Sequence, residues 1–173
     1  MIKRFFLLFA IFTTFVSESI FVDLVSVPFL SDDQTVVPHF LVVAIIAVTA
    51  YTSQSFGILC GVLFGFLYDV VYTEVIGVYT FSYPVLAFLT RWALRAFHNN
   101  AFVLVLLSML AISVLEFYTF WIYSAVGVTD LSVNMFVSNR LVPTLLLNAT
   151  VSLLLIYPFK RFILSLQIEQ IDD

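Results

Sequence analysis

Long apolar runs fill most of this chain and leave little polar surface for contact with water. Hydrophobic residues make up 62% of the 173 residues, charged residues only 10%, and phenylalanine alone occurs 20 times. Soluble domains are normally about a quarter charged, and a compact globule of this size cannot hide so much apolar surface. We therefore expect lipid, rather than water, to surround most of the chain.

Six of the runs have the length or composition of membrane helices, because a bilayer core takes roughly 20 apolar residues per helix. They cover residues 5–27, 38–51, 55–72, 75–94, 101–124 and 141–159. The runs are continuously apolar rather than alternating, which argues against a transmembrane β-barrel. The sequence predicts an all-α integral membrane protein, with residues 1–173 forming a single membrane domain of six transmembrane helices.

The second and third runs are separated only by a short polar stretch that begins at Thr52. Merged, they would form about 52 Å of helix, which is too long for one crossing. Counting them separately puts both chain ends in the cytoplasm, because basic residues favour that side. Six basic residues then lie on the cytoplasmic side: Lys3, Arg4, Arg91, Arg95, Lys160 and Arg161. Arg140 is expected on the outer side.

The sequence carries no recognisable signature of catalysis. It lacks H-E-x-x-H, Walker and G-x-S-x-G motifs, and its lone Cys60 excludes an intrachain disulfide. His39 and His98 fall at predicted membrane boundaries on opposite sides, where we expect interfacial solvation. The net charge of −4 argues against a nucleic-acid partner. We expect no metal and no cofactor.

Three glycines in the third run are spaced every fourth residue. Gly57, Gly61 and Gly65 lie on one helix face and leave a groove that a second helix can approach closely. The second helix belongs either to a partner protein or to this protein's own bundle. Asp69 continues the same four-residue ladder, and Gly77 follows eight residues later.

Four acidic residues lie inside the predicted spans, all in the outer half of the bilayer. They are Glu18, Asp23, Asp69 and Glu116. A carboxylate in mid-membrane costs about 2.5–3.5 kcal/mol on insertion scales, and Arg140 is the nearest candidate cation. We expect Glu18 and Glu116 to line an outer polar pocket in which Asn148 forms hydrogen bonds. Asp23 and Asp69 fit either that pocket or the headgroup layer.

The stretch from residue 57 to residue 89 resembles the bacterial rod shape-determining MreD family. That family carries a G-x-x-x-G-F-x-x-D run at the end of one span, then a short outer loop and a glycine that opens the next. The matching positions are Gly61, Gly65, Phe66, Asp69 and Gly77. The loop from Tyr72 to Glu74 departs from the pattern, because it is poorer in glycine, serine and proline.

This resemblance implies a non-enzymatic membrane component of the cell-wall elongation machinery in the bacterial plasma membrane. It implies as partners a bitopic MreC-like protein, an MreB-like actin homologue, and the wall polymerase and transpeptidase. The six residues from Gly57 to Gly77 named above then serve helix packing or partner docking.

Two other functions stay open. The family is similar in size and span number to the substrate-binding membrane subunit (the S-component) of energy-coupling-factor transporters, and an outward acidic pocket would suit a cationic or polar ligand. An intramembrane enzyme would use Glu18 or Glu116 as an acid or base, but no nucleophile or metal site accompanies them.

Overall fold

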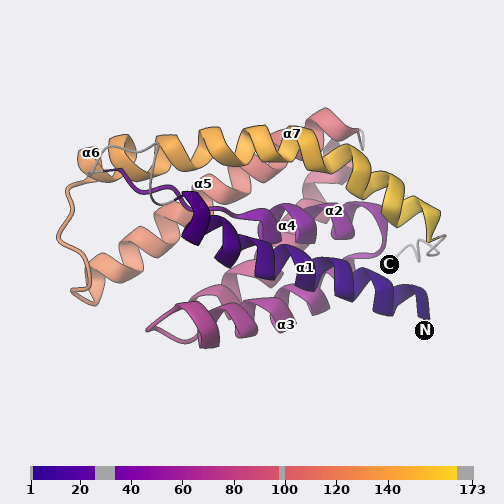
Figure 1. Ribbon diagram of the computed structural model, residues 1–173, viewed down its shortest axis with the longest axis horizontal. Coiled ribbons are helices and arrows are strands. Elements are labelled where there is room, and N and C mark those ends of the chain that lie inside the picture. The colour runs from indigo at the N-terminus through magenta and orange to yellow at the C-terminus, as the bar shows by residue number, and fades with distance from the viewer. Residues whose placement is uncertain (1, 26–33, 98–99, 167–173) are drawn as a thin grey trace.

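Helices make up the regular structure of the residues that the computed structural model describes, 2–25, 34–97 and 100–166. They are α1 (Ile2–Val25), α2 (Phe40–Tyr51), α3 (Gln54–Tyr72), α4 (Val78–Ala96), α5 (Ala101–Ala125), α6 (Val133–Phe136), the π-helical turn η1 (Val137–Leu141) and α7 (Val142–Ser165). The last three are continuous and form one rod, so the described residues contain six helical rods. Figure 1 shows the long helices running mostly along the long axis of the molecule.

Four of these rods are long and apolar enough to cross a membrane. They cover Lys3–Val22, Gln54–Tyr72, Ala101–Ala125 and Val133–Ser165. α4 is as long as α3 but less apolar, and α2 has only 12 residues, about 18 Å of helix against a bilayer core of about 30 Å. The prediction of an all-helical, multi-helix membrane protein is confirmed, and six full crossings stay a prediction.

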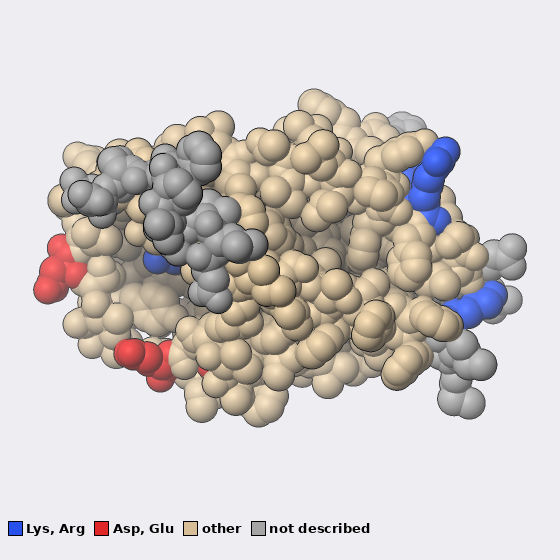
Figure 2. All heavy atoms as spheres, viewed as in Figure 1, with Lys and Arg blue, Asp and Glu red and all other residues tan. Residues whose placement is uncertain are grey.

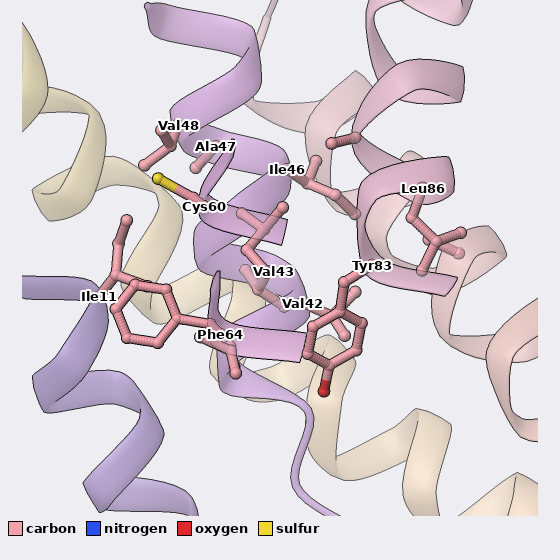
Figure 3. Packing of buried hydrophobic residues seen from close by; sticks show 14 of the residues in the cluster. Ile11, Val42, Val43, Ile46, Ala47, Val48, Cys60, Phe64, Tyr83 and Leu86 are labelled. Carbon is pink, nitrogen blue, oxygen red and sulfur yellow. The ribbon is translucent and has the colours of Figure 1, made fainter. Parts of the chain in front are cut away.

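The short helix α2 forms the centre of the bundle. All of its residues are buried, and it contacts α1, α3, α4, α5 and α7. Figure 3 shows Val42, Val43, Ile46, Ala47 and Val48 of α2 among Ile11 of α1, Cys60 and Phe64 of α3, and Tyr83 and Leu86 of α4. A helix that is apolar on every side is stable only where no side faces water. Lipid would meet that condition too, so the packing of the surrounding helices decides its central position.

An extended segment, residues 34–39, precedes α2 and runs beside the rod formed by α6, η1 and α7. The Thr35 N–H donates to the carbonyl of Asn139 at 2.9 Å, and the Val37 N–H donates to the Thr144 hydroxyl at 3.1 Å. Non-helical backbone at membrane depth requires such partners, because lipid offers none. The run predicted to begin at residue 38 therefore becomes helical only at Phe40.

Other helix boundaries also differ from the predicted spans. α4 begins at Val78 rather than at residue 75, because Gly77 occupies its N-cap with a φ of +108°. The last rod begins at Val133 rather than at residue 141, and the Ser132 hydroxyl caps its first turn by accepting from Met135 N–H. The rod also extends beyond residue 159, to Ser165.

The outer surface is largely apolar and its charges are divided between two ends. Large hydrophobic side chains are exposed on every long helix, for example Phe9 on α1, Phe66 on α3 and Phe102 on α5. Figure 1 places the start of α1 and the end of α7 at one end of the molecule. In Figure 2 basic residues are found at that end, and acidic residues lie at the opposite end.

Candidate functional site

A buried ion network lies at the start of α2. The His39 ring Nε2 donates to Glu116 Oε1 at 2.7 Å, and the Arg140 Nε donates to Glu116 Oε2, also at 2.7 Å. The side chains of His39 and Glu116 are 0% and 1% exposed, whereas that of Arg140 is 30% exposed. Each carboxylate oxygen of Glu116 therefore has a charge-assisted partner, which offsets the cost of burying it.

The π-helical turn η1 carries Arg140 toward this network. Its five residues end at Leu141, and α7 continues directly from it. A π-turn inserts an extra residue into the helical repeat and shifts the residues around it relative to an unbroken helix. Arg140 reaches Glu116 on α5 from this turn, so the local irregularity lies where the rod supplies its ion-pairing side chain.

Asn148 on α7 holds the backbone that leads into α2. Its Oδ1 accepts from the His39 N–H at 2.8 Å. Its Nδ2 donates to the carbonyls of Val37 and Thr144, both at 2.8 Å. The amide thus satisfies backbone groups of the extended segment that would otherwise be buried without partners.

Glu18 on α1 caps α2 from a neighbouring helix. Its Oε1 accepts from the Leu41 N–H at 2.6 Å. The first N–H groups of a helix have no partner within the helix and carry partial positive charge, so a carboxylate is stabilised there. The second oxygen, Oε2, is buried and has no hydrogen-bond partner among the described residues.

Asp69 on α3 likewise caps α4, because its carboxylate accepts hydrogen bonds from the first N–H groups of that helix. It is fully buried, and its carboxylate accepts from the N–H groups of Gly77, Tyr79 and Thr80 and from the Thr80 hydroxyl. Asp69 is therefore enclosed by the protein, where it joins the end of α3 to the start of α4. The left-handed φ of Gly77, which side chains other than glycine rarely adopt, turns the chain so that these donors face Asp69.

The three glycines of the four-residue ladder lie against other helices of this chain. A Cβ on Gly57 would lie 2.0 Å from the Thr49 hydroxyl oxygen of α2. A Cβ on Gly61 would meet the backbone of Pro84 at 2.7 Å, and one on Gly65 the carbonyl oxygen of Tyr79 at 2.4 Å, both on α4. The Phe66 side chain, in contrast, is 54% exposed on the outer face of α3.

Sequence reasoning missed two members of the polar centre. His39 was expected to be solvated at the membrane boundary, and that expectation is wrong because the residue is fully buried. Arg140 was considered only as a nearby cation. The signal for both was the acidic Glu116 in an apolar span, because a buried carboxylate requires hydrogen-bond donors as partners. His98 and the side chain of Asp23 lie outside the described residues.

A pocket of about 340 Å³ adjoins the Glu18 cap. It is lined by Glu18, Ser19 and Val22 of α1, Val37 and Pro38 of the extended segment, and Tyr68 and Tyr72 of α3. Glu116 and Asn148 are not among its lining residues. The structure therefore separates the three predicted pocket residues into Glu18, which lines a pocket, and Glu116 with Asn148, which belong to the network around His39.

The polar groups mostly fix the positions of helices relative to one another. Glu18, Asp69 and Asn148 satisfy backbone groups at helix starts, and Glu116 joins α5 to the segment before α2 and to η1. Within residues 2–25, 34–97 and 100–166, no group of three or more His, Cys, Asp or Glu side chains could hold a metal ion. These features define a multi-helix membrane protein organised around a buried polar centre.

Comparisons with known proteins identify the family. The family model for the rod shape-determining protein MreD matches residues 3–166. The rod shape-determining protein MreD of Bacillus subtilis (strain 168) is 43% identical over 171 residues, covering 99% of each chain. The chain therefore belongs to the MreD family of bacterial membrane proteins, as its G-x-x-x-G-F-x-x-D run indicated. No solved structure matches it.

Proposed function

We propose that this protein is a non-enzymatic scaffold of the cell-wall elongation machinery, with six membrane crossings in the bacterial plasma membrane. The observation that carries the proposal is the match to the rod shape-determining family over residues 3–166. Basic residues near the end of the molecule where α1 begins and α7 ends support a cytoplasmic position for both termini.

The hydrogen bonds that the buried carboxylates accept support a scaffold function rather than catalysis. Both oxygens of Glu116 accept hydrogen bonds, one from the His39 ring and one from the Arg140 guanidinium, and the carboxylate of Asp69 accepts four hydrogen bonds. A general base needs a lone pair that is free to accept a substrate proton. Glu18 Oε2 has one, but no group of three or more His, Cys, Asp or Glu side chains among the described residues could hold a metal beside it. The geometry instead stabilises one arrangement of helices, which is what a docking platform requires.

The outward face of α3 is the surface that we propose for docking. Gly57, Gly61 and Gly65 are occupied by packing against α2 and α4. The opposite face of the helix presents a stripe of exposed apolar side chains, Leu59, Leu63, Phe66 and Val70, which are 50–55% exposed. A single-span partner helix fits such a stripe, and the bitopic MreC-like protein is the proposed occupant.

The test combines complementation with crosslinking in cells. The tagged chain replaces the resident family member in a rod-shaped bacterium, and proteins captured after mild crosslinking are identified by mass spectrometry. We expect the complemented cells to keep their rod shape. We also expect the crosslinked sample to contain an MreC-like protein, an MreB-like actin homologue, and the wall polymerase and transpeptidase. Recovery of a transporter ATPase module without wall synthases would overturn the proposal in favour of a transporter subunit.

The docking surface has its own matched pair of variants. Phe66→Ala removes an exposed aromatic anchor from α3 and is expected to lower recovery of the MreC-like protein by about tenfold or more. Phe102→Ala removes a phenylalanine of α5 that is 67% exposed, against 54% for Phe66, and should leave recovery unchanged. Equal recovery with both variants would show that the partner binds elsewhere.

A further inference from the structure

We propose that the pocket beside Glu18 binds a primary ammonium group carried on a hydrocarbon body. This inference goes beyond the proposed function and does not depend on it. Glu18 is 3% exposed and lines the pocket. Its Oε1 accepts from the Leu41 N–H, whereas its Oε2 has no partner among the described residues.

The unpartnered oxygen calls for a hydrogen-bond donor. A buried polar oxygen without a partner costs free energy whether the group is charged or neutral. His39 and Arg140 do not supply that donor. Arg140 and the Nε2 of His39 are bound to Glu116, and the Nδ1 of His39 has no hydrogen-bond partner among the described residues. The remaining source of a hydrogen-bond donor for Glu18 Oε2 is a molecule that enters the pocket. A cationic ligand would also compensate the charge of the carboxylate, and water is the competing occupant.

The other lining residues favour a cation attached to an apolar body. The rings of Tyr68 and Tyr72 lie 4.9 Å apart, edge to face, and aromatic faces attract an ammonium ion by cation–π interaction. Val22, Val37 and Pro38 add an apolar wall. An anionic ligand is disfavoured by the Glu18 carboxylate, and the volume of about 340 Å³ holds only a small group or part of a larger one.

Two sources carry this chemistry in a membrane. One is a phospholipid with an ethanolamine headgroup, and the other is a free alkylamine. Val22 and Tyr72 are 46% and 39% exposed, so the rim of the pocket is accessible from outside the bundle. The shared requirement is an N–H donor with positive charge at Glu18 Oε2.

The experiment uses the full chain purified in detergent. Native mass spectrometry measures the retention of phosphatidylethanolamine against phosphatidylglycerol with identical acyl chains. In parallel, the thermal unfolding temperature is titrated with decylamine and, as the uncharged control, with decanol. A preference for phosphatidylethanolamine over phosphatidylglycerol, or for decylamine over decanol, supports the site. The first preference identifies a lipid headgroup as the source of the ammonium group, and the second identifies a free alkylamine.

Three variants locate the binding. Glu18→Gln keeps an acceptor for Leu41 N–H but removes the charge, and should weaken amine binding by about tenfold or more. Val22→Trp fills the pocket from its rim without touching the cap, and should abolish binding even if Glu18→Gln does not fold. Glu74→Gln removes an exposed charge at the α3–α4 turn and should change binding by less than about twofold.

Two results would overturn the proposal. The first is equal binding of amine and control, which would mean that water alone occupies the pocket. The second is an amine preference that Val22→Trp leaves unchanged, which would place the amine at another surface.

Discussion

The ring of His39 lies 2.7 Å from the carboxylate of Glu116, although the two residues are 77 positions apart in the chain. This contact joins the extended segment before α2 to the middle of the bundle. Arg140 binds the other oxygen of the same carboxylate. The three residues connect the central helix, α5 and the π-turn at a depth where lipid offers no alternative partners.

Removing the central carboxylate should therefore strongly destabilise the bundle. Glu116→Ala leaves both His39 and Arg140 without their buried partner, and breaking a buried pair from one side costs about 3–5 kcal/mol. Chemical unfolding in mild detergent measures the loss, with the exposed Glu74→Gln as the control. A loss of stability no larger than that of the control would contradict a structural role for the network.

A double-mutant cycle measures the coupling energy between Arg140 and Glu116 separately from the effect of burying each side chain. Arg140→Leu alone leaves Glu116 with only the His39 partner, whereas Arg140→Leu with Glu116→Leu removes both members of the pair. We expect the double variant to be more stable than the sum of the single losses predicts, by about 0.5–3 kcal/mol. Additive losses in the same unfolding assay would mean that the pair contributes no coupling.

Asn148→Leu tests the support of the extended segment. The variant keeps the number and branching of the side-chain heavy atoms but removes the acceptor for His39 N–H and the donor to the Val37 carbonyl. Each buried backbone group left without a partner costs about 1–3 kcal/mol. Thr150→Leu, at an exposed position of the same helix, should be close to neutral. Comparable unfolding midpoints for the two variants would argue against this support.

Asp69→Asn tests the cap of α4. An asparagine retains one acceptor oxygen, but its amide cannot accept from Gly77 and Thr80 as the second carboxylate oxygen does. We expect a loss of about 1–3 kcal/mol in unfolding free energy. Because Arg140 binds Glu116 rather than Asp69, adding Arg140→Leu should not reduce the effect of Asp69→Asn. A reduced effect would reveal a dependence of the cap on Arg140.

Gly61→Ala tests the close approach of α3 and α4. The added methyl group would meet the backbone of Pro84, which cannot move aside as a flexible side chain could. We expect a loss of about 1–3 kcal/mol from overpacking, and a greater loss with Gly61→Leu. The control is Val62→Leu, which enlarges the adjacent exposed residue. Normal stability and normal cell shape with Gly61→Leu would contradict the packing assignment.

The sequence alone determined the class of the protein and most of its helices. Continuous apolar runs lead to helices in lipid, because a helix satisfies its backbone hydrogen bonds within one segment. The G-x-x-x-G-F-x-x-D run likewise indicated the family, because a local motif needs no knowledge of distant contacts. Helix ends shifted at Val78 and Val133, where capping by Asp69 and Ser132 overrode the apolar pattern.

Only the tertiary structure decided which buried polar groups meet. The partners of His39 are 77 and 109 positions away along the chain, and no local pattern specifies such pairings. Burial of every residue of α2 likewise depends on the helices around it. The physical reason is that lipid gives all apolar surfaces nearly the same environment, so helix arrangement depends on close packing and polar contacts between distant segments.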